Sequence, residues 1–463
     1  MNWCATEWPG FFHQSSFAME AESSNSPSGV ATCLPTVGQS RFAIDGHLPR
    51  WVCTPESYPE ISFLLKEANA KHWSVVPFGA GTKQHVGNPL KSFDIALSME
   101  RFDRIVEYEP QDLVVKVEGG CRLKNLQSQL AQDGLWLPVD PSSGGESTLG
   151  GIVSTHESGP SRFSQGTIRD YLIGITLVQP DGALTKFGSR VVKNVTGYDM
   201  CKLYTGAFGT LGVLLDFFFK LKPIPTAQNT VIVALSELSR VREIMNRIVR
   251  SSLTPMAVEL LNPKAAAFLN AELDLTRQKD CYLLVLLFGD VQRSVEWQVG
   301  HVEELVQDLV SEGIKITEAT GQQTLWQWIR EDLPWMERTG ANVKLKVNSL
   351  PSQLTDILSR LEGLGNELGA QLWIKSHAGN GIVRAFLNME NSNPIIQRFS
   401  RKLEELRSFL KPSRGTAVLE AAREPFKQLI DVWGYEFKDK AIMRRIRERF
   451  DGGQVLNPGR FVV

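Results

Sequence analysis

Residues 140–159 read DPSSGGESTLGGIVSTHESG, and this stretch decides how the whole chain is interpreted. Five glycines and seven serines or threonines stand among its twenty residues. Because small residues put no large side chain in the way, a planar ligand can lie against such a backbone. Further on, the run Ile175–Val178 and the turn Pro180–Gly182 are typical of a strand that ends in a tight turn. The stretch therefore predicts a ligand-binding loop in a domain that contains a sheet.

A second glycine-rich loop, PFGAGTKQHVG at residues 77–87, directly follows a predicted strand. Glycines let backbone N–H groups approach an anion, and successive amides form a nest that binds phosphate. The loop does not match the dinucleotide-binding fingerprint GxGxxG, because Gln84 stands where the third glycine belongs. It also lacks the GK[ST] ending of a Walker A loop. Taken alone, a loop of this kind is more often a simple turn.

A third such stretch, GAFGTLGV at residues 206–213, follows KNVTGYD at 193–199. The ordered set PxGxGT, DPxS, TLGG, RDxxxG, KNxTGYD, GTLG and the terminal VLNPGRF (455–461) resembles the vanillyl-alcohol-oxidase/PCMH family of FAD proteins. Within that family the chain is most similar to the FAD-binding subunits of bacterial glycolate oxidase, also called glycolate dehydrogenase. The resemblance implies an α+β fold, with a two-part PCMH-type FAD-binding domain and a smaller α+β cap domain.

The same resemblance implies which residues hold the FAD. The pyrophosphate would lie in the first loop, against Pro77, Gly79, Ala80, Gly81, Thr82, Lys83, Gln84 and His85, and its cradle would continue with Pro141, Ser142, Thr148, Gly150 and Gly151. The ribityl chain and the flavin ring would follow Thr155, Ser158 and Gly159, and Gly209, Val213 and Asn457 would complete the site. Relatives that attach FAD covalently often have a histidine beside these glycines, whereas His85 lies at the far end of the loop. We therefore expect non-covalent FAD, and we expect Gly150→Val to release it by pushing a Cβ into the ligand's space.

Catalysis depends on residues 377–384, which read HAGNGIVR. Catalytic relatives carry HxGDGNxH, whose two histidines hold a metal, but here Asn380 replaces the aspartate and Arg384 replaces the second histidine. The chain is therefore expected to hold no metal. Oxidation of a 2-hydroxy acid needs a base near the hydroxyl and a cation near the carboxylate. His377 is the predicted base, and Arg384 or Arg460 the predicted cation. A lone histidine is, however, more often a hydrogen-bonded structural residue.

The composition narrows the class of protein. The 463 residues include 50 Lys and Arg and 51 Asp and Glu, so the net charge of −1 argues against a nucleic-acid-binding protein. No apolar stretch approaches the ~20 residues of a membrane-spanning helix. The six cysteines form no CxxC pair, so no iron–sulfur cluster is expected, and electrons would leave through another subunit. The scattered thiols predict reduced cysteines in a cytoplasmic protein that reaches a membrane only through its partners.

The pattern along the chain predicts four segments. Residues 1–45 form a flexible N-terminal segment without a secretory signal, and its aromatic residues either dock a partner or fold against the domain. Residues 46–225 form the FAD-binding domain, 226–420 the cap domain, and 421–463 a helical segment that returns to the FAD domain. Three elements illustrate the expectation: a hairpin at 104–117, a helix over 293–312 and a mostly helical stretch over 426–450.

Two functions follow from the resemblance. In the first, the chain is the FAD-binding subunit of a glycolate oxidase complex, which oxidises glycolate or a similar D-2-hydroxy acid and passes the electrons to an iron–sulfur subunit. In the second, the chain is a flavin-loaded structural or electron-relay subunit, and a sister flavoprotein with both histidines performs the oxidation. A flavoprotein that oxidises a bulky alcohol is a third interpretation, because the cap domain determines the substrate.

Overall fold

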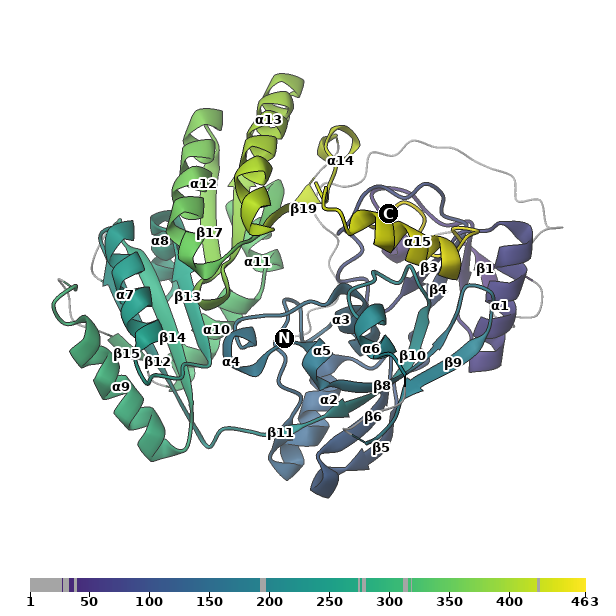
Figure 1. The fold of residues 1–463 in the computed structure, drawn as a ribbon, viewed down its shortest axis with the longest axis horizontal. Helices are drawn as coiled ribbons and strands as arrows, with labels where there is room; N and C mark the ends of the chain where they lie inside the picture. Colours follow the sequence, from purple (N-terminus) through teal and green to yellow (C-terminus); the bar gives the residue numbers. More distant parts are fainter. Residues whose placement is uncertain are drawn as a thin grey trace.

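The chain folds into two mixed domains that lie side by side, as the ribbon in Figure 1 shows. This computed structural model describes residues 27, 33–36, 40–191, 197–273, 275–276, 280–310, 315–317, 319–422 and 425–463. Most of the predicted N-terminal segment, including its aromatic residues, lies outside the described residues. None of the described helices is both long and apolar enough to cross a bilayer.

The first domain is built on two sheets. A four-stranded sheet has the order β1 (Cys33–Pro35), β2 (Trp51–Cys53), β4 (Ile95–Ser98), β3 (Val75–Phe78). A five-stranded antiparallel sheet has the order β5 (Ile105–Glu109), β6 (Val114–Glu118), β10 (Val213–Lys220), β8 (Leu172–Val178), β9 (Leu184–Gly188). A short pair, β7 (Leu135–Trp136) and β11 (Lys222–Pro223), completes the domain. The predicted hairpin is confirmed, because β5 and β6 pair antiparallel.

Helices cover both sheets of this domain. They are α1 (Tyr58–Lys71), α2 (Leu123–Leu130), α3 (Leu149–Thr155), α4 (Arg162–Gln165), α5 (Ile168–Tyr171) and α6 (Met200–Tyr204). In α1 the apolar residues Ile61, Leu64, Leu65 and Ala68 recur at helical spacing and are fully buried. Burial of each larger side chain contributes about 2 kcal/mol, so packing rather than helix propensity holds α1 in place.

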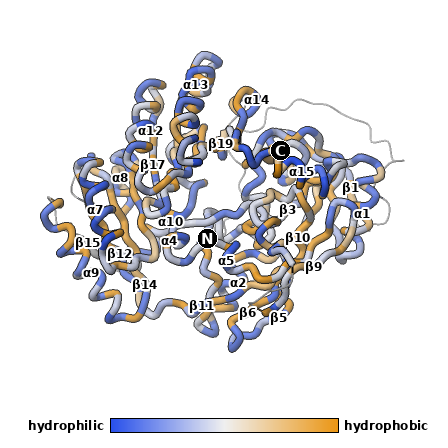
Figure 2. The backbone as a smooth tube through the Cα atoms, viewed as in Figure 1, coloured by the Kyte–Doolittle hydropathy of each residue, from blue (hydrophilic) through white to orange (hydrophobic). Residues whose placement is uncertain are grey.

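The cap domain is an eight-stranded antiparallel sheet with helices on both faces. Its order is β15 (Lys315–Thr317), β12 (Ala227–Leu235), β14 (Tyr282–Asp290), β13 (Ala257–Leu261), β17 (Gln371–His377), β18 (Ile382–Asn388), β16 (Val343–Asn348), β19 (Thr416–Ala422). One face packs on α7 (Leu238–Arg250), α9 (Gln292–Val306), α12 (Leu354–Leu368) and α13 (Asn393–Leu410). The other packs on α8 (Pro263–Leu273), α10 (Ala319–Arg330) and α11 (Leu333–Thr339). Figure 2 shows the central strands as mostly hydrophobic, as burial on both faces requires.

The C-terminal segment crosses back to the first domain (Figure 1). The backbone N–H of Val75 in β3 donates to the carbonyl of Val455 at 2.7 Å, so the last residues continue the edge of the first sheet. The prediction of a mostly helical stretch over 426–450 is confirmed, because α14 (Phe426–Leu429) contributes 4 helical residues and α15 (Lys440–Phe450) contributes 11. Between them Gly434 has a φ of +53°, a left-handed conformation that a right-handed helix does not contain.

Two expectations need correction. Cys33 and Cys53 form a disulfide, whereas the sequence predicted six reduced cysteines. The two residues are 20 positions apart, but they lie directly opposite each other because β1 pairs antiparallel with β2. That pairing is a tertiary feature, which no cysteine spacing reveals. The helix predicted to end at 312 ends at Val306, and residues 311 and 312 lie outside the described residues.

Candidate active site

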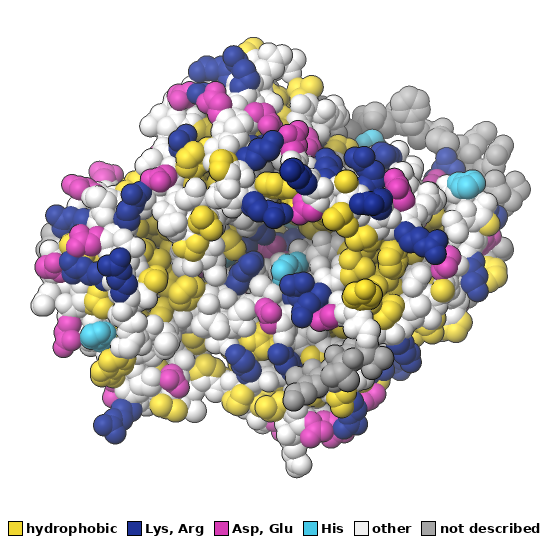
Figure 3. Space-filling model, viewed as in Figure 1, with side chains coloured by type: hydrophobic (Ala, Val, Ile, Leu, Met, Phe, Trp, Pro, Cys, Tyr) yellow, Lys and Arg dark blue, Asp and Glu magenta, His cyan; other side chains and the backbone are white. Residues whose placement is uncertain are grey.

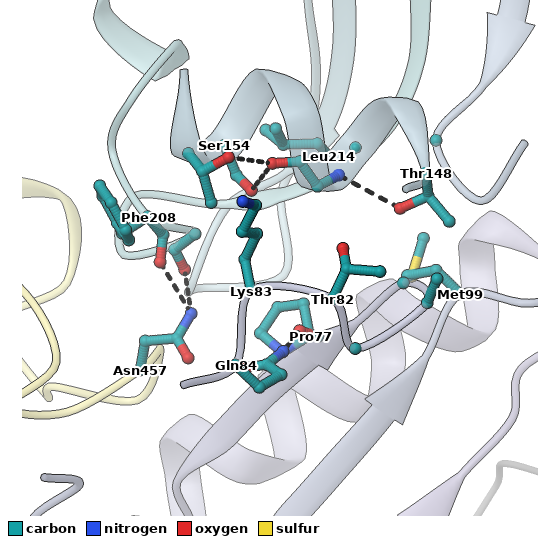
Figure 4. Close-up of a pocket in the computed structure, with 18 of the residues that line it drawn as sticks. Pro77, Thr82, Lys83, Gln84, Met99, Thr148, Ser154, Phe208, Leu214 and Asn457 are labelled. Carbon is teal, nitrogen blue, oxygen red and sulfur yellow. Dashed lines mark hydrogen bonds between the residues drawn. The ribbon is translucent and has the colours of Figure 1, made fainter. Parts of the chain in front are cut away.

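A cleft opens at the carboxyl end of β3, and Figure 4 shows side chains that line it. Its walls come from the loop after β3, from both ends of α3, from the segment that enters β10 and from the C-terminal segment. The glycine-rich loops that are far apart in the sequence therefore meet around one space.

The loop after β3 has the properties of an anion-binding nest. The backbone amides of Gly79–Lys83 donate no hydrogen bond to the described part of the chain. Gly81 has a φ of +74°, and a Cβ built on it would meet no atom within 4 Å, so the loop faces open space there. Successive free amides around a left-handed residue bind anions such as phosphate. The cleft therefore fits the diphosphate of FAD at this loop.

The glycines of the two main loops leave room for a ligand, and they also allow the loops to pack closely against neighbouring residues. A Cβ on Gly79 would overlap Thr148 Oγ1, and a Cβ on Gly150 would lie 2.9 Å from the carbonyl oxygen of Gly119. Thr148 also caps α3, because its side chain accepts a hydrogen bond from the N–H of Gly151. The expected reason for a Gly150→Val defect is therefore corrected: the added Cβ would strike backbone, not the ligand.

The C-terminal segment closes one side of the cleft. Asn457 Nδ2 donates to the carbonyls of Phe208 at 3.0 Å and Gly209 at 3.1 Å. Arg460 donates to the carbonyls of Gln84 and of Asn88, the latter at 3.1 Å. Its guanidinium also pairs with Asp45 at 3.0 Å and is only 4% exposed. Arg460 thus lines the cleft, but the contacts that the structure gives its side chain are to protein.

Most of the predicted FAD-binding residues surround this cleft. Those that line it are Pro77, Gly79, Ala80, Gly81, Thr82, Lys83, Gln84, Thr148, Gly150, Gly151, Thr155, Gly209, Val213 and Asn457. His85 and Ser142 line a second cavity instead. Pro141, Ser158 and Gly159 line neither. Gly159 packs against the backbone of Asp140, and the carbonyl of Ser158 accepts from Arg384 at 3.0 Å.

Sequence reasoning missed seven lining residues: Val86, Met99, Gly119, Ser154, Phe208, Gly212 and Leu214. Val86, Ser154, Phe208 and Gly212 lie inside stretches that the motifs had marked, so their position could have been inferred. Met99 and Gly119 follow the ends of β4 and β6 and carry no motif. Phe208 has a φ of +53°, and its ring packs on Trp433 and Phe461 with centroids 4.9 Å and 5.0 Å away.

The second cavity, of about 540 Å³, lies between the two domains. It shares three residues, Gly81, Thr82 and Lys83, with the cleft, so the two spaces adjoin. The first domain also contributes His85, Ser142 and Ser143, and the cap domain contributes Asp332, Leu333, Met336 and Lys344. A molecule in this cavity would lie beside whatever fills the cleft.

A network of buried ion pairs lies behind the second cavity. It joins five cations and three carboxylates through N···O distances of at most 4.0 Å: Lys83, Lys344, Lys346, Lys375 and Arg384 with Glu157, Asp332 and Glu420. The shortest pair, Lys344 with Asp332, is 2.5 Å long. In Figure 3 basic, acidic and histidine side chains gather near the middle of the face, between the two domains.

The network keeps its carboxylates ionised. Lys344 and Lys375 hold the pKa of Asp332 well below its usual range, and Lys344 and Lys346 do the same for the pKa of Glu420, despite the burial of both groups. Burial lowers the pKa of Lys375 to about 8, because it destabilises the charged ammonium group. Burial also raises the pKa of Glu259.

His377 is part of a closed hydrogen-bond chain. Its Nδ1 lies 2.7 Å from Glu259 Oε1, and its Nε2 lies 2.7 Å from Arg384 Nη1. A guanidinium can only donate, so Nε2 accepts and the ring proton lies on Nδ1. Burial first, and then Arg384, lower the pKa of His377. The lone pair that a general base would use is therefore occupied, as in a structural histidine.

Arg384 is similarly engaged. Besides His377, it donates to Glu157 at 3.1 Å and to the carbonyl of Ser158 at 3.0 Å, and it is 1% exposed. Glu157 and Ser158 belong to the first domain, so this arginine joins the cap to it. Within the described residues, no group of three or more histidine, cysteine or acidic side chains is arranged to hold a metal ion.

Comparison with known proteins gives the family. A model of the FAD binding domain matches residues 49–188, and a model of the C-terminal domain of FAD linked oxidases matches residues 224–408. The chain belongs to the FAD-linked oxidases. It is thus an FAD-dependent oxidoreductase, and the amide nest and the cleft described above fit this cofactor. When bound, FAD supplies the hydride-accepting chemistry, and the chain supplies binding and orientation.

Individual proteins are also similar to this chain in sequence or in fold. Glycolate oxidase subunit GlcD of Bacillus subtilis is 24% identical over 428 residues, which cover 89% of both chains. Mitochondrial D-lactate dehydrogenase [cytochrome] of Arabidopsis thaliana is 25% identical over 439 residues, covering 92% of this chain and 75% of that one. The crystal structure of p-cresol methylhydroxylase with substrate bound superposes with a TM-score of 0.71 over 91% and 92% of the two chains, at 14% identity. The predicted two-domain PCMH-type fold is therefore confirmed.

Proposed function

We propose that this FAD-linked oxidoreductase oxidises a small 2-hydroxy acid, such as glycolate, to the 2-oxo acid. The observation that carries the proposal is the second cavity, which adjoins the flavin cleft through Gly81–Lys83 and is walled by the cap domain. Its lysines suit an anionic substrate. The relatives named as glycolate oxidase, D-lactate dehydrogenase and D-2-hydroxyglutarate dehydrogenase support the same substrate class.

The proposal includes the assembly in which the chain works. The sequence contains no CxxC motif for an iron–sulfur cluster, so electrons would pass from the non-covalently held FAD to an iron–sulfur subunit. A sister flavoprotein would complete the complex. In this scheme the chain's own residues exclude water, hold the substrate's carboxylate and orient its C2–H bond toward the flavin.

One observation favours a second candidate function. His377, the histidine kept from the catalytic motif of relatives, has both ring nitrogens engaged by Glu259 and Arg384. A site closed in this way suits a flavin-loaded relay or structural subunit, whose sister flavoprotein would remove the hydride. The two candidates differ in whether the isolated chain reacts with substrate.

An anaerobic visible spectrum of the isolated, FAD-loaded chain distinguishes them. The proposed function predicts that the flavin band bleaches when glycolate, or D-lactate, is added. A band that stays unchanged with both acids, and bleaches only after the sister subunits are added, would contradict it and support the relay function. Dithionite serves as the control, because it must reduce the flavin in either case.

A further inference from the structure

The second cavity offers positive charge that the protein does not fully use. Lys344 donates to Asp332 at 2.5 Å and lies 2.6 Å from Glu420, but an ammonium group has three N–H donors. Lys83 lies 3.4 Å from Glu157 Oε1, which is long for a bond between charged groups. Each lysine that lines the cavity can therefore accept a further anionic partner.

The balance of charge around the cavity also favours the binding of an anion. Five cations face three carboxylates in the ion-pair network, which leaves two positive charges uncompensated within it. Asp332 also lines the cavity, but it is paired with Lys344 and Lys375. Because buried unbalanced charge is costly, an anion that enters the cavity is stabilised there.

The two arginines predicted from the sequence do not compete for this role. Arg384 donates to His377, Glu157 and the carbonyl of Ser158, and does not line the cavity. Arg460 lines the flavin cleft and binds Asp45 and loop carbonyls. Lys83, by contrast, lines both spaces, and Figure 4 shows its side chain extending across the cleft toward Ser154.

We infer that Lys83 and Lys344 form a carboxylate-binding site in the second cavity, with Lys83 bridging it to the flavin cleft. The inference rests on the proposed function, for which it names the residues that hold the substrate's carboxylate. Ser142 adds a donor, because its Oγ accepts from the N–H of Asp332 at 3.1 Å and keeps its own proton for a ligand. The ligand class is a small carboxylate with the reacting carbon next to it.

Oxalate is a suitable probe, since it has the two-carbon size of glycolate and no C–H bond to oxidise. Calorimetric titration of the FAD-loaded chain should show oxalate binding, together with a shift of the flavin band. Oxamide, which has the same shape without charge, should not bind measurably. The variants are Lys83→Met and Lys344→Met, with Lys438→Met as the control because Lys438 is exposed and lies outside both cavities.

Either lysine variant should weaken oxalate binding roughly 10- to 100-fold, the loss expected for one hydrogen bond between charged groups. Lys438→Met should bind oxalate like the wild type. Unchanged oxalate affinity in both FAD-loaded lysine variants would overturn the inference. If Lys344→Met fails to fold, Lys344→Arg decides: it keeps the charge and must retain oxalate binding, and loss of binding there would count against the site.

Two other results are also informative. If Lys83→Met loses FAD while Lys344→Met, loaded with FAD, binds oxalate like the wild type, Lys83 serves the flavin cleft alone and the carboxylate site is wrong. If oxalate binds as expected while glycolate fails to bleach the isolated chain, the carboxylate site stands and the proposed oxidation by this chain fails. The two ideas can therefore fail separately.

Discussion

The flavin cleft and the ion-pair network adjoin and share Lys83, yet they are built from different chemistry. The cleft is made of backbone amides and small residues in three loops of the first domain. The network is made of long charged side chains, most of which come from the cap domain. A backbone site tolerates changes to polar side chains but not added atoms, whereas a side-chain network is sensitive to the loss of any one charge.

The largest effect is expected from Arg384→Met. Removing this guanidinium leaves Glu157 buried beside fewer cations and His377 without its donor, so the free energy of unfolding should fall by about 3–5 kcal/mol. Urea denaturation measures it. Arg338→Met, which removes an exposed ion pair with Glu272, should cost less than about 1 kcal/mol. Equal stability of the two variants would show that the network does not hold the domains together.

Gly150→Val tests whether the cleft depends on close packing of its backbone, as Arg384→Met tests whether the network depends on its charges. The new Cβ would lie 2.9 Å from the carbonyl oxygen of Gly119, and such overpacking typically costs about 1–3 kcal/mol. The purified variant should therefore contain less FAD, by absorbance, and melt earlier. Gly145→Val is the matched control, because a Cβ there meets nothing within 4 Å. FAD content that is equally normal in both variants would be evidence against the close loop packing.

His156, at the C-terminal end of α3, provides a pH test at the border of the two regions. Burial, followed by Arg162, lowers its pKa to about 4, so it stays neutral in the folded state. The unfolded state binds a proton near pH 6.5, and stability should therefore fall as pH drops from 6.5 to 4, by about 1.4 kcal/mol per pH unit for this group.

His156→Asn should flatten that part of the pH profile, since asparagine tolerates the φ of +53° at this position. Unfolding by urea at pH 7, 6 and 5 gives the slope. His301→Asn, on the outer helix α9, is the control and should leave the wild-type slope unchanged. A slope that is the same in all three proteins would contradict the assignment of a neutral, buried imidazole.

The smallest effect is expected from Arg460→Met. The variant removes the N–H groups that donate to the carbonyls of Gln84 and Asn88 and so position the loop. FAD should therefore bind roughly 5- to 10-fold more weakly, which corresponds to a loss of about 1 kcal/mol in binding free energy. Flavin fluorescence quenching measures the affinity. The same loss with Lys438→Met would assign the effect to net charge alone, and an unchanged affinity would leave Arg460 no part in positioning the loop.

The comparison also explains which lining residues the sequence could mark. Fourteen residues predicted to bind FAD line the cleft, and the glycines among them are visible in any sequence, because a backbone that must approach a ligand or another backbone requires glycine. The network gave no such signal. Lys344, Lys346 and Glu420 each look like surface residues, and only the pairing of β16 with β18 and β19 brings them together.

By itself, the sequence determined the family, the two-domain fold and the glycine-rich loops that line the cleft, since these depend on local spacing and on small residues. Only the tertiary structure decided that Cys33 meets Cys53, that Arg384 occupies the lone pair of His377, and that Lys83 and Lys344 face one cavity. The most distant of these pairs, Lys83 and Lys344, lies 261 positions apart in the sequence. Their energies come from burial and charge balance, which no segment of the chain possesses before it folds.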